Sequence, residues 1–299
     1  MSDNYLISAK EHYLSIEVVD AFAHYLADFL STRAFASPYL TENLRPKTHY
    51  CFVSIQDAYE QFMMEPKNVE LETRADQFRE PIREALLAPD DEKLNELINA
   101  LYEERLQKRN NEWLLGIDLT VSDLIGYGYE QFKSESPEYH LFGIKHGPRM
   151  TSNLSRIYSL LIDDFLTYES RVVATLCYFV REFCLEKGIK LPAELQFYRL
   201  QGWGKDKKVN ERNASWGDNI FPSLDAVKKQ PKRESEFAKS NSLASWVCSR
   251  AIEIALQRPE AQWLAGDRLR SQRLFRARAF FMMGARLPSY RESDQSQAD

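Results

Sequence analysis

The 299-residue chain contains little glycine, with 11 residues, and little proline, with 12. The shortage of both residues argues against glycine-rich nucleotide cradles and against β folds with many tight turns. No run of 18 or more apolar residues occurs, so we expect no membrane-spanning helix. The first ten residues lack the basic and apolar regions of a secretory signal peptide. We therefore expect a soluble, cytoplasmic protein.

Cysteine and histidine are also scarce, and neither follows a metal-binding spacing. No pair of cysteines is separated by two residues. Two of them are seven residues apart, which on a helix is roughly 10 Å and too far for a disulfide. We predict small buried hydrophobic residues in a reducing compartment, no metal site and no cofactor. The four cysteines are Cys51, Cys177, Cys184 and Cys248.

The residues that are present favour a helical protein with a substantial core. Apolar residues make up 44% of the chain and aromatic residues 12%, which is enough to exclude wholesale disorder. Apolar positions recur every three or four residues, the spacing of a helix with one buried face. We predict an all-α, multi-helix globular protein. The expected helices cover 16–31, 52–64, 90–101, 120–132, 152–163, 167–187, 241–257 and 266–284.

Several helix ends carry recognisable signals. Thr120 and Asp123 have the spacing of a capping box, and Ser152 or Asn153 is expected to cap the helix that follows. Gly188 is a typical C-terminal glycine for the helix at 167–187. That helix is apolar around more than half of its circumference, so we expect it at the centre of the core.

Charge divides the chain unevenly. Residues 1–150 have a formal net charge of about −11 and residues 151–299 of about +6, which together give the −5 of the whole chain. We expect an acidic helical region over 1–135, a basic helical region over 136–290 and a disordered tail over 291–299. A basic half is typical of a surface for nucleic acid or another polyanion. The alternative is that the two halves neutralise each other across an interface.

One irregular segment mixes aromatic and basic residues. Over 197–233 glycine and proline break the helical pattern, and we expect an exposed loop. Aromatic rings stack on bases while cations neutralise phosphates, so this mixture suits a nucleic-acid-binding surface. Alternatively, the two tryptophans pack back onto the core. The candidate binding residues are Arg199, Trp203, Lys205, Lys207, Lys208, Arg212 and Trp216.

The residues from 141 to 187 carry a family resemblance. A glycine-containing turn, Leu141-Phe142-Gly143-Ile144, precedes a helix, and the run Tyr168-Glu169-Ser170-Arg171-Val172 then enters a second, longer helix. This arrangement resembles the helix-hairpin-helix DNA glycosylase superfamily over about 50 residues. In that family a glycine-containing hairpin is followed by a helix, and an acidic residue stands at the start of the next helix.

The resemblance implies base excision. Enzymes of this kind flip a base out of the duplex, while the hairpin presents backbone N–H groups to a phosphate. By analogy, Gly143, Gly147 and Arg149 would contact DNA, and Glu169 would stabilise positive charge as the glycosidic bond breaks. Bifunctional members add a lysine that forms a Schiff base with the sugar, and here that residue would be Lys145. Two differences stand out: Lys145 occupies the place of a second hairpin glycine, and Glu169 replaces the usual aspartate.

Three functions fit these observations. The first is a DNA-binding helical protein that cleaves N-glycosidic bonds. The second is a non-catalytic DNA-binding accessory factor, such as one from a mobile element or a phage-defence system. The third is a protein-interaction module, in which a protein partner replaces DNA. Glu169 has a structural alternative as well, because a carboxylate at the start of a helix stabilises that helix.

Overall fold

The computed structural model describes residues 7–33, 54–64, 66–88, 90–102, 119–200 and 217–265. These residues form helices and one isolated β-bridge, between Arg199 and Ser223, with no strand among them. The all-α prediction is therefore confirmed. The α-helices are α1 (Ala9–Leu14), α2 (Glu17–Ser31), α3 (Ile55–Met63), α4 (Pro66–Leu87), α5 (Asp91–Tyr102), α6 (Val121–Lys133), α7 (Ser152–Leu161), α8 (Ser170–Lys187) and α9 (Gln230–Ala255). Short 3₁₀ turns are η4 (Tyr139–Leu141), η5 (Ala193–Leu195), η6 (Leu224–Ala226) and η7 (Pro259–Leu264).

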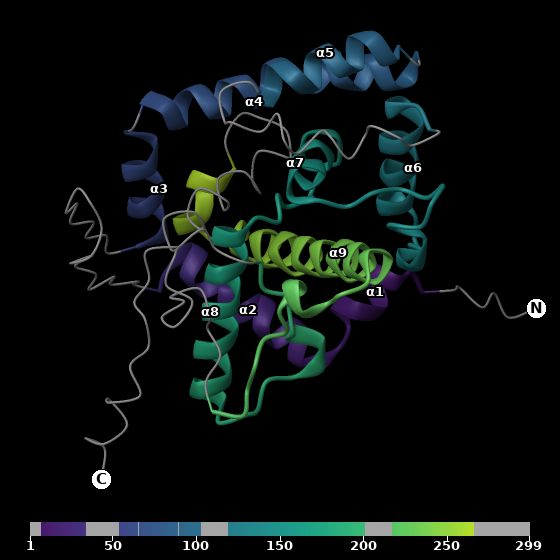
Figure 1. The fold of residues 1–299 in the computed structure, drawn as a ribbon. Helices are drawn as coiled ribbons and strands as arrows, with labels where there is room; N and C mark the ends of the chain where they lie inside the picture. Colours follow the sequence, from purple (N-terminus) through teal and green to yellow (C-terminus); the bar gives the residue numbers. More distant parts are fainter. Residues whose placement is uncertain are drawn as a thin grey trace, which may run out of the picture.

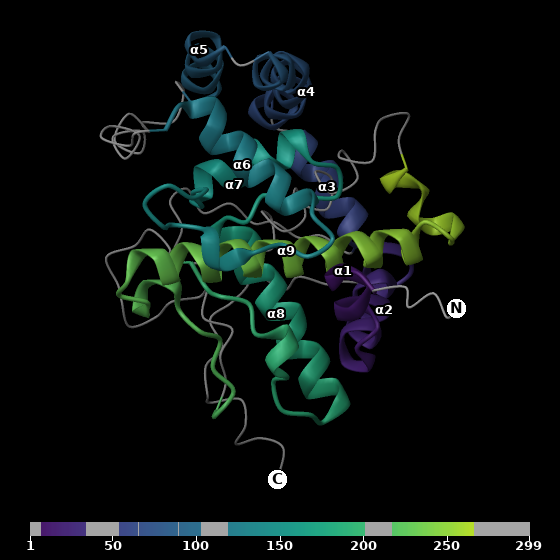
Figure 2. The same cartoon turned by 90° about the vertical axis from the view of Figure 1, so that its right-hand side faces the viewer.

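Helix α9 runs through the middle of the molecule (Figures 1 and 2). Helices α1 and α2 pack along one side of it and η4 lies against another side. Helices α6 and α7 lie on the side of α9 that faces α4 and α5, which form an outer layer. The buried apolar side chains form one core, which includes residues from both sides of position 135. The division into an acidic and a basic region stays a prediction about charge.

Helix α8 is central to this core, as its apolar pattern predicts. Two neighbouring rows of apolar side chains along this helix are almost completely buried: Val172, Leu176, Phe179 and Phe183 in one row, and Val173, Cys177, Val180 and Cys184 in the other. The helix ends at Gly188, which has the left-handed conformation with φ +63°. Cys177, Cys184 and Cys248 are free and buried, which fits the prediction for these three; Cys51 lies outside the described residues. Burial raises the pKa of the Cys184 thiol to about 11 and that of Cys248 to about 12, so both thiols stay protonated near neutral pH.

The starts of α6, α7 and α8 agree with the sequence signals to within three residues. Thr120 caps α6 by accepting a hydrogen bond from the backbone N–H of Asp123 at 3.0 Å. Helix α7 is capped by Thr151 rather than by Ser152 or Asn153, because the Thr151 hydroxyl reaches the N–H of Leu154. Helix α8 begins at Ser170, three residues later than predicted, because the residues before it are held in an extended conformation.

Two helical regions differ from the prediction. Helix α9 begins at Gln230, eleven residues before the predicted start at 241, because Pro231 lies in the first turn, where a missing N–H is tolerated. The expected exposed loop over 197–233 therefore ends early, and Phe221 and Leu224 within it are buried. Helix α4 was not predicted, since charged residues interrupt its apolar spacing and Pro81 is typical of a helix break. The predicted helix at 266–284 and the predicted tail at 291–299 lie outside the described residues.

Candidate nucleic-acid interface

The turn at 142–150 is compact and depends on its glycines. The backbone N–H of Gly143 donates to the carbonyl of Pro148 at 2.9 Å, and that of Gly147 donates to the carbonyl of Ile144 at 3.1 Å. Gly143 has a φ of +81°, which favours glycine. A Cβ atom on Gly147 would lie 2.1 Å from the carbonyl oxygen of Leu141, so a side chain there would not fit. The tip of the turn, at 144–146, is exposed.

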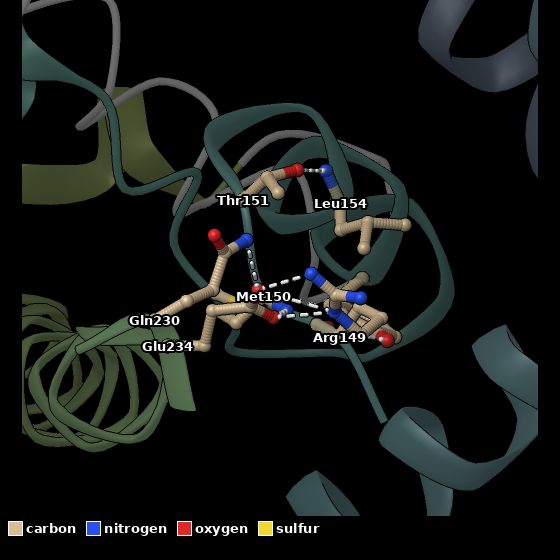
Figure 3. Close-up of polar contacts among 7 residues, drawn as sticks. Arg149, Met150, Thr151, Leu154, Gln230 and Glu234 are labelled. Atoms are coloured by element: carbon tan, nitrogen blue, oxygen red, sulfur yellow. Dashed lines mark hydrogen bonds and ion pairs between the residues drawn. The ribbon is translucent and has the colours of Figure 1, made fainter. Parts of the chain in front are cut away.

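A buried ion pair fixes this turn to α9. The Arg149 guanidinium donates to the Glu234 carboxylate from Nε at 2.9 Å and from Nη2 at 2.5 Å. Glu234 is only 4% exposed and accepts two further hydrogen bonds, from the N–H of Met150 at 2.8 Å and from the Gln230 amide at 3.0 Å. Figure 3 shows these donors converging on the one carboxylate. We call this arrangement the Glu234 clamp.

The Glu234 clamp satisfies a charge that would otherwise be costly to bury. Removing a carboxylate from water costs several kcal/mol in principle, and close opposite charge with full hydrogen bonding offsets that cost. Loss of one partner leaves the other buried without a counter-charge. The pair therefore fixes the position of the turn on α9, whatever its net contribution to stability.

A second set of buried polar contacts fixes the segment before α8. The N–H of Leu166 donates to the Ser245 hydroxyl at 2.9 Å, and the Asn241 amide donates to the Leu166 carbonyl at 2.8 Å. The Ser155 hydroxyl donates to Asn241 at 2.6 Å and accepts from the N–H of Tyr168 at 2.7 Å. All of these side chains are buried. Because both backbone groups of Leu166 and the N–H of Tyr168 already have side-chain partners, this segment stays extended and α8 starts only at Ser170.

Glu169 follows directly and occupies the N-cap position of α8. The preceding residue, Tyr168, is fully buried, and its hydroxyl donates to the carbonyl of Tyr198 at 2.8 Å. The Glu169 side chain is half-buried and forms no capping hydrogen bond with the first turn of α8, which the structure describes. The alternative in which Glu169 serves as a hydrogen-bonded cap is therefore not what the structure shows. A favourable interaction with the helix dipole is still present, because the carboxylate lies at the N-terminus.

The turn and the start of α8 are both held against the first half of α9. Glu234 holds the turn, the ring of Phe237 packs on the ring of Tyr168 with 5.4 Å between centroids, and Asn241 holds the extended segment. Seven residues separate Glu234 from Asn241, which is about 10 Å along a helix axis. One helix thus positions the two elements that the sequence resemblance singles out.

The structure also brings to the turn basic residues that the sequence analysis did not select. A Cβ atom on Gly143 would lie 2.8 Å from the Cα of Pro231, so the turn touches the first turn of α9. Three exposed lysines flank Pro231, and the exposed Lys145 lies at the tip of the turn. We call Lys145, Lys228, Lys229 and Lys232 the basic surface. The run KKQPKR at 228–233 was the available signal, but its position at the end of an expected irregular loop gave no indication of its contact with the turn.

The other predicted binding residues have different surroundings. Arg149 is held in the Glu234 clamp. Arg199 is half-buried and donates from Nε to the carbonyl of Phe221 at 2.8 Å, so it holds the loop that precedes α9. Burial lowers the pKa of Arg199. The remaining candidates lie outside the described residues: Trp203, Lys205, Lys207, Lys208, Arg212 and Trp216.

In the described ranges, no group of three or more histidine, cysteine, aspartate or glutamate side chains is placed to hold a metal ion. The described helices include none with the length and apolar character needed to cross a membrane.

No protein-family model, no curated protein and no solved structure matches this chain. The resemblance to helix-hairpin-helix glycosylases, which these comparisons do not test, stays a prediction.

The Glu234 clamp can be tested by a double-mutant cycle. Glu234→Gln leaves the Arg149 guanidinium buried without its counter-charge, and we expect a loss of about 3 kcal/mol in the free energy of unfolding. Arg149→Met likewise leaves the Glu234 carboxylate buried without its counter-charge. The double variant removes both charges, so it should be more stable than the sum of the two losses predicts, by about 1–3 kcal/mol. Urea unfolding of the four proteins measures this coupling, and additive losses would contradict the clamp.

Proposed function

We propose that this protein binds DNA through the basic surface formed by Lys145, Lys228, Lys229 and Lys232. The observation that carries this proposal is the contact between the turn, which bears the exposed Lys145, and Pro231 of α9, which is flanked by three exposed lysines. No ion pair to a carboxylate is found for these four lysines within the described part of the chain. A cluster of like charges attracts a polyanion and repels itself in its absence.

The position of three of these lysines supports a binding role over a stabilising one. Lys228, Lys229 and Lys232 lie at the start of α9, where the helix dipole is positive and positive side chains reduce helix stability. Lysines at these positions therefore reduce the stability of the helix, whereas their positive charges favour the binding of phosphate groups. The regularly spaced phosphates of DNA offer several negative charges to one such surface.

The test compares two triple variants with the same change in charge. Lys228→Gln/Lys229→Gln/Lys232→Gln removes three charges from the basic surface, whereas Lys93→Gln/Lys187→Gln/Lys190→Gln removes three exposed charges from α5, the end of α8 and the segment after it. We expect the first variant to bind duplex DNA more weakly at 100 mM salt. Its slope of log K against log salt concentration should be smaller by about 2.7, because each phosphate that the variant no longer neutralises accounts for about 0.9.

Fluorescence anisotropy on a labelled duplex measures both quantities. The control triple variant should bind as the wild type does. Equal weakening by the two variants would mean that only net charge matters, and absence of binding by the wild type at low salt would remove DNA as the partner. The latter result would favour a protein partner in its place.

Base excision is a second, narrower candidate, favoured by the position of Glu169 at the start of α8. The preceding residue, Tyr168, is held by buried contacts to Ser155 and Tyr198, and the Glu169 carbonyl accepts a hydrogen bond from the N–H of Val173. In this reaction the bond between the sugar C1′ and the base nitrogen breaks and the electron pair leaves with the base. Water then supplies a hydroxyl to the sugar and a proton to the base. Glu169 would stabilise the positive charge that develops on the sugar, while the exposed Lys145 would contact a phosphate rather than form a Schiff base.

Glu169→Gln separates catalysis from binding. It removes the negative charge but keeps nearly the same shape, so we expect base release to fall by at least 100-fold while DNA affinity changes little. Release is measured on a panel of duplexes that each carry one damaged base, with Glu130→Gln on the exposed face of α6 as the control. If the wild type releases no base from any duplex, the enzyme candidate is wrong and the binding proposal is unaffected.

A further inference from the structure

We infer that the basic surface contacts the sugar–phosphate backbone of duplex DNA without reading the bases, so that its partner is DNA of any sequence. This inference rests on the proposed DNA-binding function and goes further, because it states which part of the DNA is recognised. It follows from which polar side chains at this surface are exposed and which are already held by carboxylates.

The side chains suited to reading bases are occupied by protein partners. Arginine reads guanine, and glutamine reads adenine, through two parallel hydrogen bonds to the base edge. Here Arg149 makes such a two-pronged contact with Glu234, and the Gln230 amide donates to the same carboxylate. Arg233 donates to Asp225 at 2.9 Å. Arg149, Gln230 and Arg233 therefore each have a carboxylate partner in the protein, and the pair between Arg233 and Asp225 lies at the exposed surface.

The four lysines of the basic surface are all exposed. An ammonium is a compact, strongly hydrated point charge on a flexible stem, without the planar fork of a guanidinium. It neutralises a phosphate as a point charge, and it lacks the geometric specificity that the planar fork of a guanidinium brings to a base edge. A surface made of four such groups gains its affinity from counterion release, which does not depend on sequence.

The placement of α9 also argues for contact with the DNA backbone rather than with the bases. A recognition helix projects from the protein and lays its side chains in the major groove. Helix α9 instead passes through the middle of the molecule, with α2 packed along it (Figure 2). Only its first turn, with Lys232 and Arg233, is exposed at the basic surface. This helix therefore reaches the DNA end-on, which allows contact with phosphates but not insertion along a groove.

The experiment measures sequence dependence directly on the full-length wild-type protein. Three labelled 20-base-pair duplexes are used: one rich in A·T pairs, one rich in G·C pairs and one mixed. We expect dissociation constants that agree within about threefold, and no enriched motif after selection from a library of random duplexes. A reader of base edges would show differences of about 5- to 150-fold for each altered base pair.

The Lys228→Gln/Lys229→Gln/Lys232→Gln variant completes the test. If the surface contacts only the backbone, this variant should lose affinity for all three duplexes by the same factor. A preference of tenfold or more by the wild type, an enriched motif, or a loss confined to one duplex would overturn the inference and leave the proposed function standing. Failure to bind any of the three duplexes at low salt would overturn both.

Discussion

Buried polar side chains on α9 constrain the rest of this structure. Glu234, Asn241 and Ser245 point into a core from which water is excluded, and each must find hydrogen-bonding partners there. Glu234 finds them in Arg149 and the backbone of the turn, and the other two find them in the segment before α8. Because an unsatisfied group would be costly, these two irregular segments have one favourable position on the helix.

This constraint links the fold to the proposed function. Turns and extended segments are usually the mobile parts of a helical protein, yet here they are held by buried contacts to a central helix. The turn that carries Lys145 touches Pro231 in the first turn of α9, and Glu169 lies at the start of α8 after the extended segment. A rigid support of this kind allows charges from distant segments to act on one ligand.

Much of the helical framework could be predicted from the sequence, because buried helical faces leave a regular apolar spacing. The pattern predicted α8 and its end at Gly188, whose conformation only glycine adopts readily. Long-range polar contacts leave no such spacing. Nothing local to Arg149 indicates that Glu234, 85 residues later, will bind it, so the sequence pattern favoured DNA as the partner of Arg149. For the same reason the basic surface was missed: KKQPKR was visible as a basic run, but its contact with the turn arises only from the fold.

Native-state hydrogen exchange tests the central claim most directly. The amides of Met150, Leu166 and Tyr168 donate to side chains on α9 or to a residue bound to it. If buried contacts hold both segments on α9, these three amides should exchange only through global unfolding, with the same opening free energy as amides in the middle of α9. Opening at a free energy several kcal/mol lower, while the α9 amides stay protected, would contradict this account.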